Sequence, residues 1–277
     1  MARGTATPVP AAQPRVRRGY FECRYGQLHV HNAIPPGGGF EEGTSLLCLH
    51  GTPLSGRLFD RFLPLAGQDR SVYAPDTPGF GGSDAPPARP VIADYAGAIG
   101  DFLDSMRFRQ IDVFGYQVGA VLAAELALAR PTQIRRVVLA SVPLLTEAER
   151  EVFQQAQSAA ALQPDGSDLA SEWQRVRESY GPGTPIDTVA TAFVEKLQNR
   201  TPSAWSAAAA LQYPLRERLG HISQPVLVLR PKDSLWEATL RVRECLPRMR
   251  LVDLPEQGLA LLQAAPRAAL EAMRAFL

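Results

Sequence analysis

Cysteine and histidine are scarce in this 277-residue sequence, which contains three cysteines and four histidines. The three cysteines, Cys23, Cys48 and Cys245, lie far apart and form no C-x-x-C pair, so we predict neither a disulfide framework nor a zinc site. This usage is typical of a reducing compartment, and we expect a cytoplasmic protein. No apolar run reaches the roughly 18 residues of a membrane-spanning helix, so no membrane partner is expected.

An excess of charge of one sign is lacking as well. Lysine and arginine together number 29 and aspartate and glutamate 28, which gives a formal net charge of +1. Such a small charge produces no field that would favour nucleic acid or an anionic membrane as a partner. Residues 1–14 are rich in proline and alanine without an apolar core, and the basic residues Arg15, Arg17 and Arg18 follow. We interpret residues 1–18 as a flexible N-terminal tail and not as a signal peptide.

The sequence does contain a regular alternation of short apolar runs and helical patterns. Apolar residues make up 45% of the chain, which is enough for a large buried core. Partial alternation at residues 20–24 and 27–31 predicts an opening hairpin. Short apolar runs typical of strands buried on both faces occur at residues 45–49, 71–74, 111–114 and 135–141. The pattern predicts an α/β fold, a mostly parallel sheet with helices on both faces.

A change of composition after Pro143 interrupts this alternation. Residues 144–220 are mainly helical in periodicity, and strand patterns resume only at residues 225–230 and 250–254. We therefore predict a small helical cap at 144–220, inserted into a core made of residues 19–143 and 221–277. Aromatic residues of this predicted cap indicate an apolar roof over a pocket: Phe153, Trp173, Tyr180, Phe193 and Trp205.

The stretch from Ile111 to Leu128 reads as a strand, a tight turn and an alanine-rich helix, with Gly115-Tyr116-Gln117-Val118-Gly119 at the turn. A G-x-S-x-G turn between strand and helix presents a nucleophilic serine. The middle residue of this turn is Gln117, and a carboxamide is neither a useful nucleophile nor a titrating group near neutral pH. The turn therefore has the glycine spacing of a turn that presents a nucleophile, but its middle residue lacks a nucleophilic atom.

Three further motifs appear in a recognisable order. His50-Gly51-Thr52-Pro53 follows a buried strand, the segment from Asp76 to Ser83 (DTPGFGGS) follows the next, and Asp233 follows a late strand. Together with the turn at Gln117, they resemble the α/β-hydrolase superfamily in its capped branch of esterases, lactonases, epoxide hydrolases and dehalogenases. The resemblance covers roughly residues 20–277, and it implies the α/β-hydrolase fold without implying the activity.

The resemblance also implies a triad of nucleophile, acid and histidine, in that chain order. Asp233 occupies the acid position. The family pattern P-x-x-G-H, closed by a later proline, aligns with residues 255–266 and puts Leu259 at the histidine position, while a short slip would select Gln257. Neither residue has an imidazole. The chain contains four histidines, and none follows Asp233: His29, His31, His50 and His221.

None of these four histidines replaces the missing base. The resemblance gives His50 a role in shaping its loop, and His221 precedes a strand at the end away from the expected site. His29 and His31 alternate on one strand with no third ligand nearby, so we interpret them as ordinary strand residues and predict no metal. We predict no cofactor, because Gly79-Phe80-Gly81-Gly82 is not a dinucleotide fingerprint.

Other parts of the implied site remain. The resemblance implies an oxyanion hole from the backbone N–H groups of Thr52 and Val118, which does not depend on the side chain at position 117. Gln117 can donate and accept hydrogen bonds, and Tyr116 beside it carries a phenol. Asp233 is either a carboxylate held by hydrogen bonds or a desolvated general base with a raised pKa, and both interpretations stay open.

Three functions are compatible with these residues. The first is a cofactor-independent, non-hydrolytic enzyme of the cyclase, isomerase or lyase type, with Gln117 and Asp233 as catalytic residues and a small apolar carbonyl-containing metabolite as substrate. The second is a catalytically inactive protein that binds a small ligand in the same pocket. The third is a hydrolase that uses a water activated by Asp233. A small molecule is the expected partner in all three, and a homodimer is left open.

Overall fold

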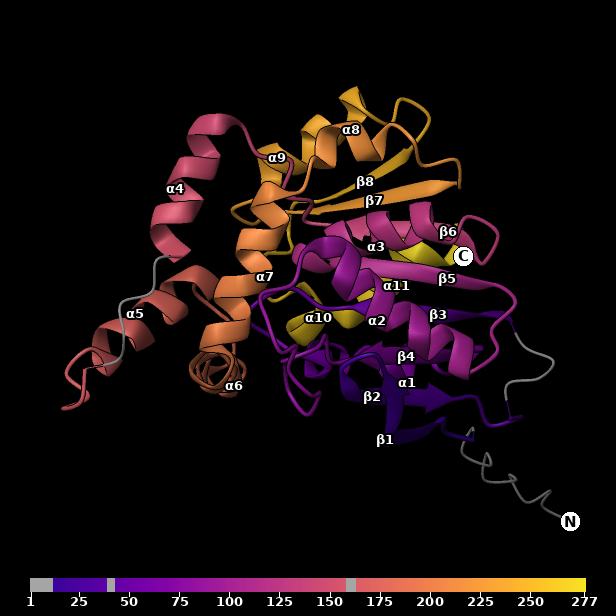
Figure 1. Cartoon of the computed structure of the whole chain (residues 1–277), viewed down its shortest axis with the longest axis horizontal. Helices are drawn as coiled ribbons and strands as arrows, with labels where there is room; N and C mark the ends of the chain where they lie inside the picture. Colours follow the sequence, from indigo (N-terminus) through magenta and orange to yellow (C-terminus); the bar gives the residue numbers. More distant parts are fainter. Residues whose placement is uncertain (1–11, 39–42, 158–162) are drawn as a thin grey trace, which may run out of the picture.

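The computed structural model describes residues 12–38, 43–157 and 163–277 (Figure 1). Eight strands form one sheet: β1 (Arg15–Cys23), β2 (Gly26–Ile34), β3 (Gly43–Leu49), β4 (Arg70–Pro75), β5 (Ile111–Tyr116), β6 (Ile134–Ala140), β7 (Val226–Pro231) and β8 (Arg250–Leu254). Their spatial order is β1-β2-β4-β3-β5-β6-β7-β8. The pairs β1–β2 and β2–β4 are antiparallel and the remaining neighbours are parallel, so the predicted mostly parallel sheet is confirmed.

The N-terminal hairpin begins earlier than the sequence suggested. Arg15 pairs with Ile34 and Arg18 with His31, so residues 15–18 belong to β1 and our assignment of them to a flexible tail is wrong. The physical reason is that a ladder of backbone hydrogen bonds to β2 continues to Arg15, although basic side chains give no strand signal. The rest of the predicted tail, up to residue 11, lies outside the described residues.

Helices cover both faces of the sheet, as predicted. Successive residues of a strand point to opposite faces, so Leu47 and Leu49 of β3 pack on one side and Leu46 and Cys48 on the other. The first side is covered by α2 (Ile92–Ser105) and α3 (Val118–Ala129), which belong to the same apolar cluster as Leu47. The second side is covered by short elements: η1 (Gly56–Phe59), α1 (Leu63–Ala66), α10 (Leu261–Ala264) and α11 (Pro266–Arg274).

A group of helices joins β6 to β7, and all but the last of them lie beside the sheet in Figure 1. Its members are α4 (Glu147–Gln157), α5 (Leu169–Tyr180), α6 (Ile186–Gln198), α7 (Arg200–Gln212) and α8 (Leu215–Leu219). Within it α5 contacts α6, and α7 contacts α4, α6 and also α2 and α3 of the sheet layer. In the described residues between β6 and β7, the helices are joined by turns and loops, and no strand occurs.

The carboxyl ends of the parallel strands meet at one edge of the sheet, which is where ligands bind in open α/β sheets. The residues that follow β3, β5, β6 and β7 at this edge include His50, Gln117, Ser141 and Asp233. Two short elements complete the fold after β7: α9 (Trp236–Leu240) and η2 (Arg241–Glu244). In the described part of the chain, no helix combines the length and the apolar character that a bilayer crossing requires.

Candidate functional site

Gln117 is the single residue between β5 and α3, and its backbone is unusual. Its φ is 54° and its ψ is −116°, a backbone conformation that residues other than glycine rarely adopt. The turn is held on both sides: the N–H of Gln117 donates to Ala140 O at 2.9 Å, and the N–H of Ala120 donates to Gln117 O at 2.9 Å. Such strained positions persist only where the surroundings enforce them, and they occur often at functional sites.

The two glycines of the turn are required by close backbone approach. A Cβ at Gly115 would lie 2.2 Å from the carbonyl oxygen of Gly119, and a Cβ at Gly119 would lie 2.0 Å from that of Leu49. Both distances are far below any real Cβ contact. The start of α3 therefore packs directly on the backbone of β3 and β5, and the G-x-x-x-G spacing has a steric cause that is independent of residue 117.

His50 connects the loop after β3 to the loop after β4. Its Nε2 accepts a hydrogen bond from the N–H of Thr77 at 2.9 Å, so the ring proton lies on Nδ1, which is 3.1 Å from Gly51 O. Burial lowers the pKa of His50 and keeps the ring neutral. The imidazole therefore shapes the loop, as the resemblance implies, and both its nitrogens are engaged.

A cavity of about 860 Å³ lies between this turn and the helices that join β6 to β7. Five of the residues selected from the sequence line it together: Thr52, Tyr116, Gln117, Val118 and Leu259. The first turn of a helix leaves its N–H groups without intrahelical partners, so the N–H of Val118 at the start of α3 is a donor at this wall.

The side chain of Gln117 lies over the loop after β3. A Cβ built on Gly51 would lie 2.7 Å from Oε1 of Gln117, so the carboxamide covers the backbone next to Thr52. The amide is thus placed beside both proposed oxyanion donors, where it can donate or accept a hydrogen bond.

Asp233 and Gln257 are not among the described residues that line the cavity. The carboxylate of Asp233 accepts hydrogen bonds from Ser141 Oγ at 2.6 Å and from the N–H of Leu235 at 2.9 Å. Burial raises the pKa of Asp233, and these two hydrogen bonds oppose the rise. Gln257 lies in the turn after β8, where its carbonyl accepts the N–H of Lys232 at 2.6 Å.

Two buried residues lie at this edge of the sheet: Tyr116, which lines the cavity, and Ser141, which does not. Ser141 is fully buried at the end of β6 and has a φ of 51°, a second strained position at this edge. The hydroxyl of Tyr116 donates to the carbonyl oxygen of Leu259 at 3.0 Å. Burial raises the pKa of Tyr116, and the charge of Asp233 adds to the effect, so the phenol stays protonated.

Three polar residues that sequence reasoning missed tie the helices after β6 to the loop after β3. Glu195 of α6 is hydrogen-bonded to Ser55, Nδ2 of Asn199 donates to Pro53 O at 2.9 Å, and Oγ of Ser206 donates to Oγ1 of Thr52 at 3.1 Å. Glu195 and Ser55 are 140 positions apart, so no local pattern connects them.

The expected apolar roof is only partly present. Of the five aromatic residues named above, Phe153 and Tyr180 line the cavity, whereas Trp173 and Phe193 pack against each other at 5.4 Å between ring centroids. Burial raises the pKa of Tyr180 to about 12. The roof is incomplete because one face of each amphipathic helix packs on its neighbours, which leaves charged residues at the cavity: Arg150, Asp168, Glu172, Arg175, Lys196 and Arg200.

His29 and His31 do have a third polar group nearby, contrary to the sequence analysis. Asp76, from the loop after β4, lies with one oxygen 2.8 Å from Nδ1 of His29 and the other 3.7 Å from Nε2 of His31. The same carboxylate accepts the N–H groups of Gly56 at 2.7 Å and Gly82 at 2.8 Å. With its oxygens already engaged in this way, we interpret Asp76 as the anchor that fixes two loops on β2.

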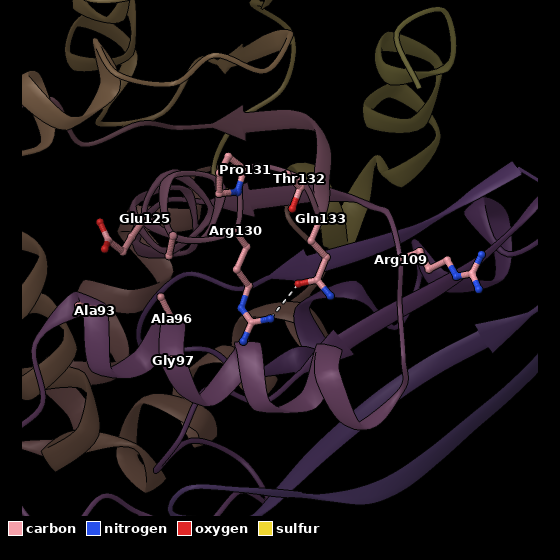
Figure 2. A pocket seen from close by; sticks show the side chains of 10 residues that line it. Ala93, Ala96, Gly97, Arg109, Glu125, Arg130, Pro131, Thr132 and Gln133 are labelled. Carbon is pink, nitrogen blue, oxygen red and sulfur yellow. Dashed lines mark hydrogen bonds between the residues drawn. The ribbon is translucent and has the colours of Figure 1, made fainter.

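A second hollow, of about 650 Å³, lies over α2 and the end of α3 (Figure 2). Arg130 projects into it and donates to Gln133 Oε1 at 2.9 Å, while its guanidinium also pairs with Asp104 at 2.6 Å. None of the residues selected from the sequence lines this hollow among those the structure describes. The ion pair of Arg130 with Asp104 connects the end of α3 to α2.

Comparisons with known proteins agree with the fold. The model of a family described as "Alpha/beta hydrolase family" matches residues 46–272. An uncharacterized hydrolase of Saccharomyces cerevisiae is 30% identical over 95 residues, which cover 34% of this chain and 33% of that protein. Epoxide hydrolase 2 of Siraitia grosvenorii is 33% identical over 110 residues, which cover 37% of this chain and 34% of that protein. The chain therefore spans about a third of the length of these relatives.

A solved structure matches over nearly the whole chain. A hydrolase from Pseudomonas aeruginosa superposes with a TM-score of 0.77 at 22% identity, covering 94% of this chain and 97% of that one. A likeness at this identity shows the fold and does not carry the activity across.

Proposed function

The chain belongs to the alpha/beta hydrolase family, and from this premise we propose that it is a cofactor-independent, non-hydrolytic enzyme. The proposed reaction is of the cyclase, isomerase or lyase type, on a small carbonyl-containing metabolite. One observation carries the proposal: Gln117 occupies the strained turn at the cavity floor, where its relatives' mechanism needs a nucleophile. We propose that residues 144–220 act as the cap of this cavity.

Loss of the triad argues against hydrolysis. Gln117 stands where the resemblance implies a serine, and we take Leu259, which lines the same cavity, to stand at the histidine position. Removing a complete triad costs on the order of a millionfold in rate, and about a thousand- to ten-thousandfold acceleration over water can remain from binding and the oxyanion hole. We therefore propose a reaction that needs polarisation and shape but no covalent intermediate.

The groups that remain fit such a reaction. The backbone N–H groups of Thr52 and Val118 would polarise a carbonyl oxygen, and the amide of Gln117 beside them would orient the substrate. The electrostatic attraction between such donors and a carbonyl oxygen is stronger in a cavity from which water is excluded than in bulk solvent. We assign Gln117 to direct contact with substrate.

We propose a different role for Asp233. Its two oxygens already accept hydrogen bonds from Ser141 and Leu235, and it is outside the set of residues that line the cavity. A carboxylate so engaged is a poor general base for a substrate or a water in the cavity. We therefore infer that Asp233 is a positioning residue for Ser141 and Tyr116, which also argues against a water-activating hydrolase.

A second candidate is a protein that binds its ligand without converting it. The observation that favours it is the engagement of Asp233, because the carboxylates among the described lining residues, Asp168 and Glu172, come from the segment between β6 and β7 and not from the floor around Gln117. This function needs only the cavity, Gln117 and the two N–H donors.

The two candidates separate in one experiment. Purified wild-type protein and the Gln117→Ala variant are incubated with a cell metabolite extract, and the mixtures are followed by mass spectrometry. The enzyme hypothesis expects metabolites that disappear and products that form with wild type, and a loss of turnover of at least about a hundredfold in the variant. A co-purified or bound metabolite that raises the melting temperature and forms no product would support the binding protein and refute the enzyme.

A further inference from the structure

The strongest unassigned feature of the cavity is a set of cations on its cap side. Among the described residues that line the cavity, four are basic and two are acidic: Arg150, Arg175, Lys196 and Arg200, against Asp168 and Glu172. The excess of two positive charges contrasts with the chain as a whole, whose formal net charge is +1 over 277 residues.

The four cations converge from different elements. Arg150 belongs to α4, Arg175 to α5, Lys196 to α6, and Arg200 is the first residue of α7. Basic residues on the solvated face of a single helix would point away from a cavity, and a set drawn from four helices does not fit that explanation. The tertiary arrangement concentrates positive charge at one site.

The acidic residue at the centre does not neutralise this set. Glu172 is 8% exposed, and its carboxylate pairs with both Lys196 and Arg175. Burial alone would raise the pKa of Glu172, but the hydrogen bonds from Lys196 and Arg175 outweigh it and hold the pKa below its usual value. One ionised carboxylate thus holds two cations in place and leaves their combined charge positive.

Apolar walls strengthen the effect of this charge. Leu145, Phe153, Val176 and Leu211 line the cavity beside the cations. Charge pairs next to apolar walls are less screened than pairs in open solvent. The side chains of Arg175 and Lys196 are 62% and 41% exposed, so they lie toward the mouth. Arg150 is only partly exposed, and its Nη1 donates to Leu211 O at 2.6 Å, which fixes the guanidinium.

We propose that the cap side of the cavity binds the carboxylate or another anionic group of the ligand, so that the substrate is an anionic carbonyl compound with an apolar body. This inference rests on the proposed function, because the carbonyl end is assigned to Gln117, Thr52 and Val118. The cavity, at about 860 Å³, is in the size range that holds both ends of one small metabolite. Guanidinium groups suit carboxylate recognition because they donate two parallel hydrogen bonds.

The test uses two probes that differ in charge and by one methyl group. The probes are β-benzoylpropionate, a keto acid, and its uncharged methyl ester, and their dissociation constants are measured by isothermal titration calorimetry on the full chain. The expected result is that the keto acid binds at least about tenfold more tightly than the ester, and that this preference falls with added salt. Equal affinities for acid and ester would overturn the inference.

Variants locate the charge that is responsible. Lys196→Gln and Arg150→Gln are each expected to lower the preference for the acid about three- to tenfold and to leave the affinity for the ester unchanged. The use of two variants guards against a folding defect at Arg150, whose hydrogen bond joins α4 to α7. Arg177→Gln is the matched control, because Arg177 is an exposed arginine of α5 outside the cavity lining. An equal loss in Arg177→Gln would refute a local site.

The same probes separate this inference from the proposed function. If Gln117→Ala weakens acid and ester alike and the two bind equally, the carbonyl site stands and the anion site is refuted. If the preference for the acid persists and Gln117→Ala changes neither affinity, the anion site stands and the role of Gln117 is refuted. If neither probe binds at millimolar concentration, both are refuted.

Discussion

Gly119→Ala is the sharpest test of how the turn around Gln117 is built. The new Cβ would lie 2.0 Å from Leu49 O, 2.5 Å from Leu49 C and 2.7 Å from His50 O. All three atoms are backbone, so no side chain can rotate away, and an ordinary contact of about 3.4 Å requires α3 and β3 to separate by roughly 1.4 Å. Overpacking a core costs about 1–3 kcal/mol.

Because all the contacted atoms are backbone, we expect the upper end of this steric cost and a net loss of about 2 kcal/mol in the free energy of unfolding. Alanine improves the helix propensity by about 1 kcal/mol over glycine, which offsets part of the steric cost. The rest is large for a protein whose total stability is of the order of 5–15 kcal/mol. The turn should open or the helix should shift, and ligand affinity should fall with it.

Urea unfolding followed by circular dichroism measures this change as a lower midpoint at constant slope. Gly258→Ala is the matched control, because the nearest atom to its new Cβ, Lys232 O, is 3.8 Å away. We expect that control to remain within about 0.5 kcal/mol of wild type. A Gly119→Ala protein as stable as the control would refute the steric explanation of the glycine spacing.

Two further predictions concern the site and its link to the helices after β6. Gln117→Ser should restore a hydroxyl in the turn but remain unlabelled by a fluorophosphonate probe, because no histidine follows Asp233 in the sequence to activate it. Labelling of this single variant would reveal a base that we have not identified. Glu195→Gln should alter the pH dependence of stability. Burial raises the pKa of Glu195 in the folded state. The contribution of this carboxyl group to the free energy of unfolding is therefore complete below about pH 4.5 and is lost as the pH rises. Urea unfolding should therefore find the variant equal to wild type near pH 4 and more stable near pH 8, and a difference that does not change with pH would contradict this.

The fold, the glutamine in the turn and the lack of a histidine after Asp233 can all be read from the amino-acid sequence. These are local signals: apolar runs buried in a parallel sheet, the periodicity of helices, and motifs whose residues are adjacent in the chain. The start of β1 at Arg15 could not be read, because a backbone ladder extends it through basic residues that carry no strand pattern.

The use of the polar side chains depends on contacts between residues that are far apart in the chain. Asp233 is engaged by Ser141, which is 92 positions away, and Asp76 joins His29 across 47 positions. The cations of the cavity come from four helices whose relative rotation depends on how each packs its apolar face on its neighbours. Periodicity predicts that such a face exists but not which partner covers it, so the charge of the cavity was decided by packing.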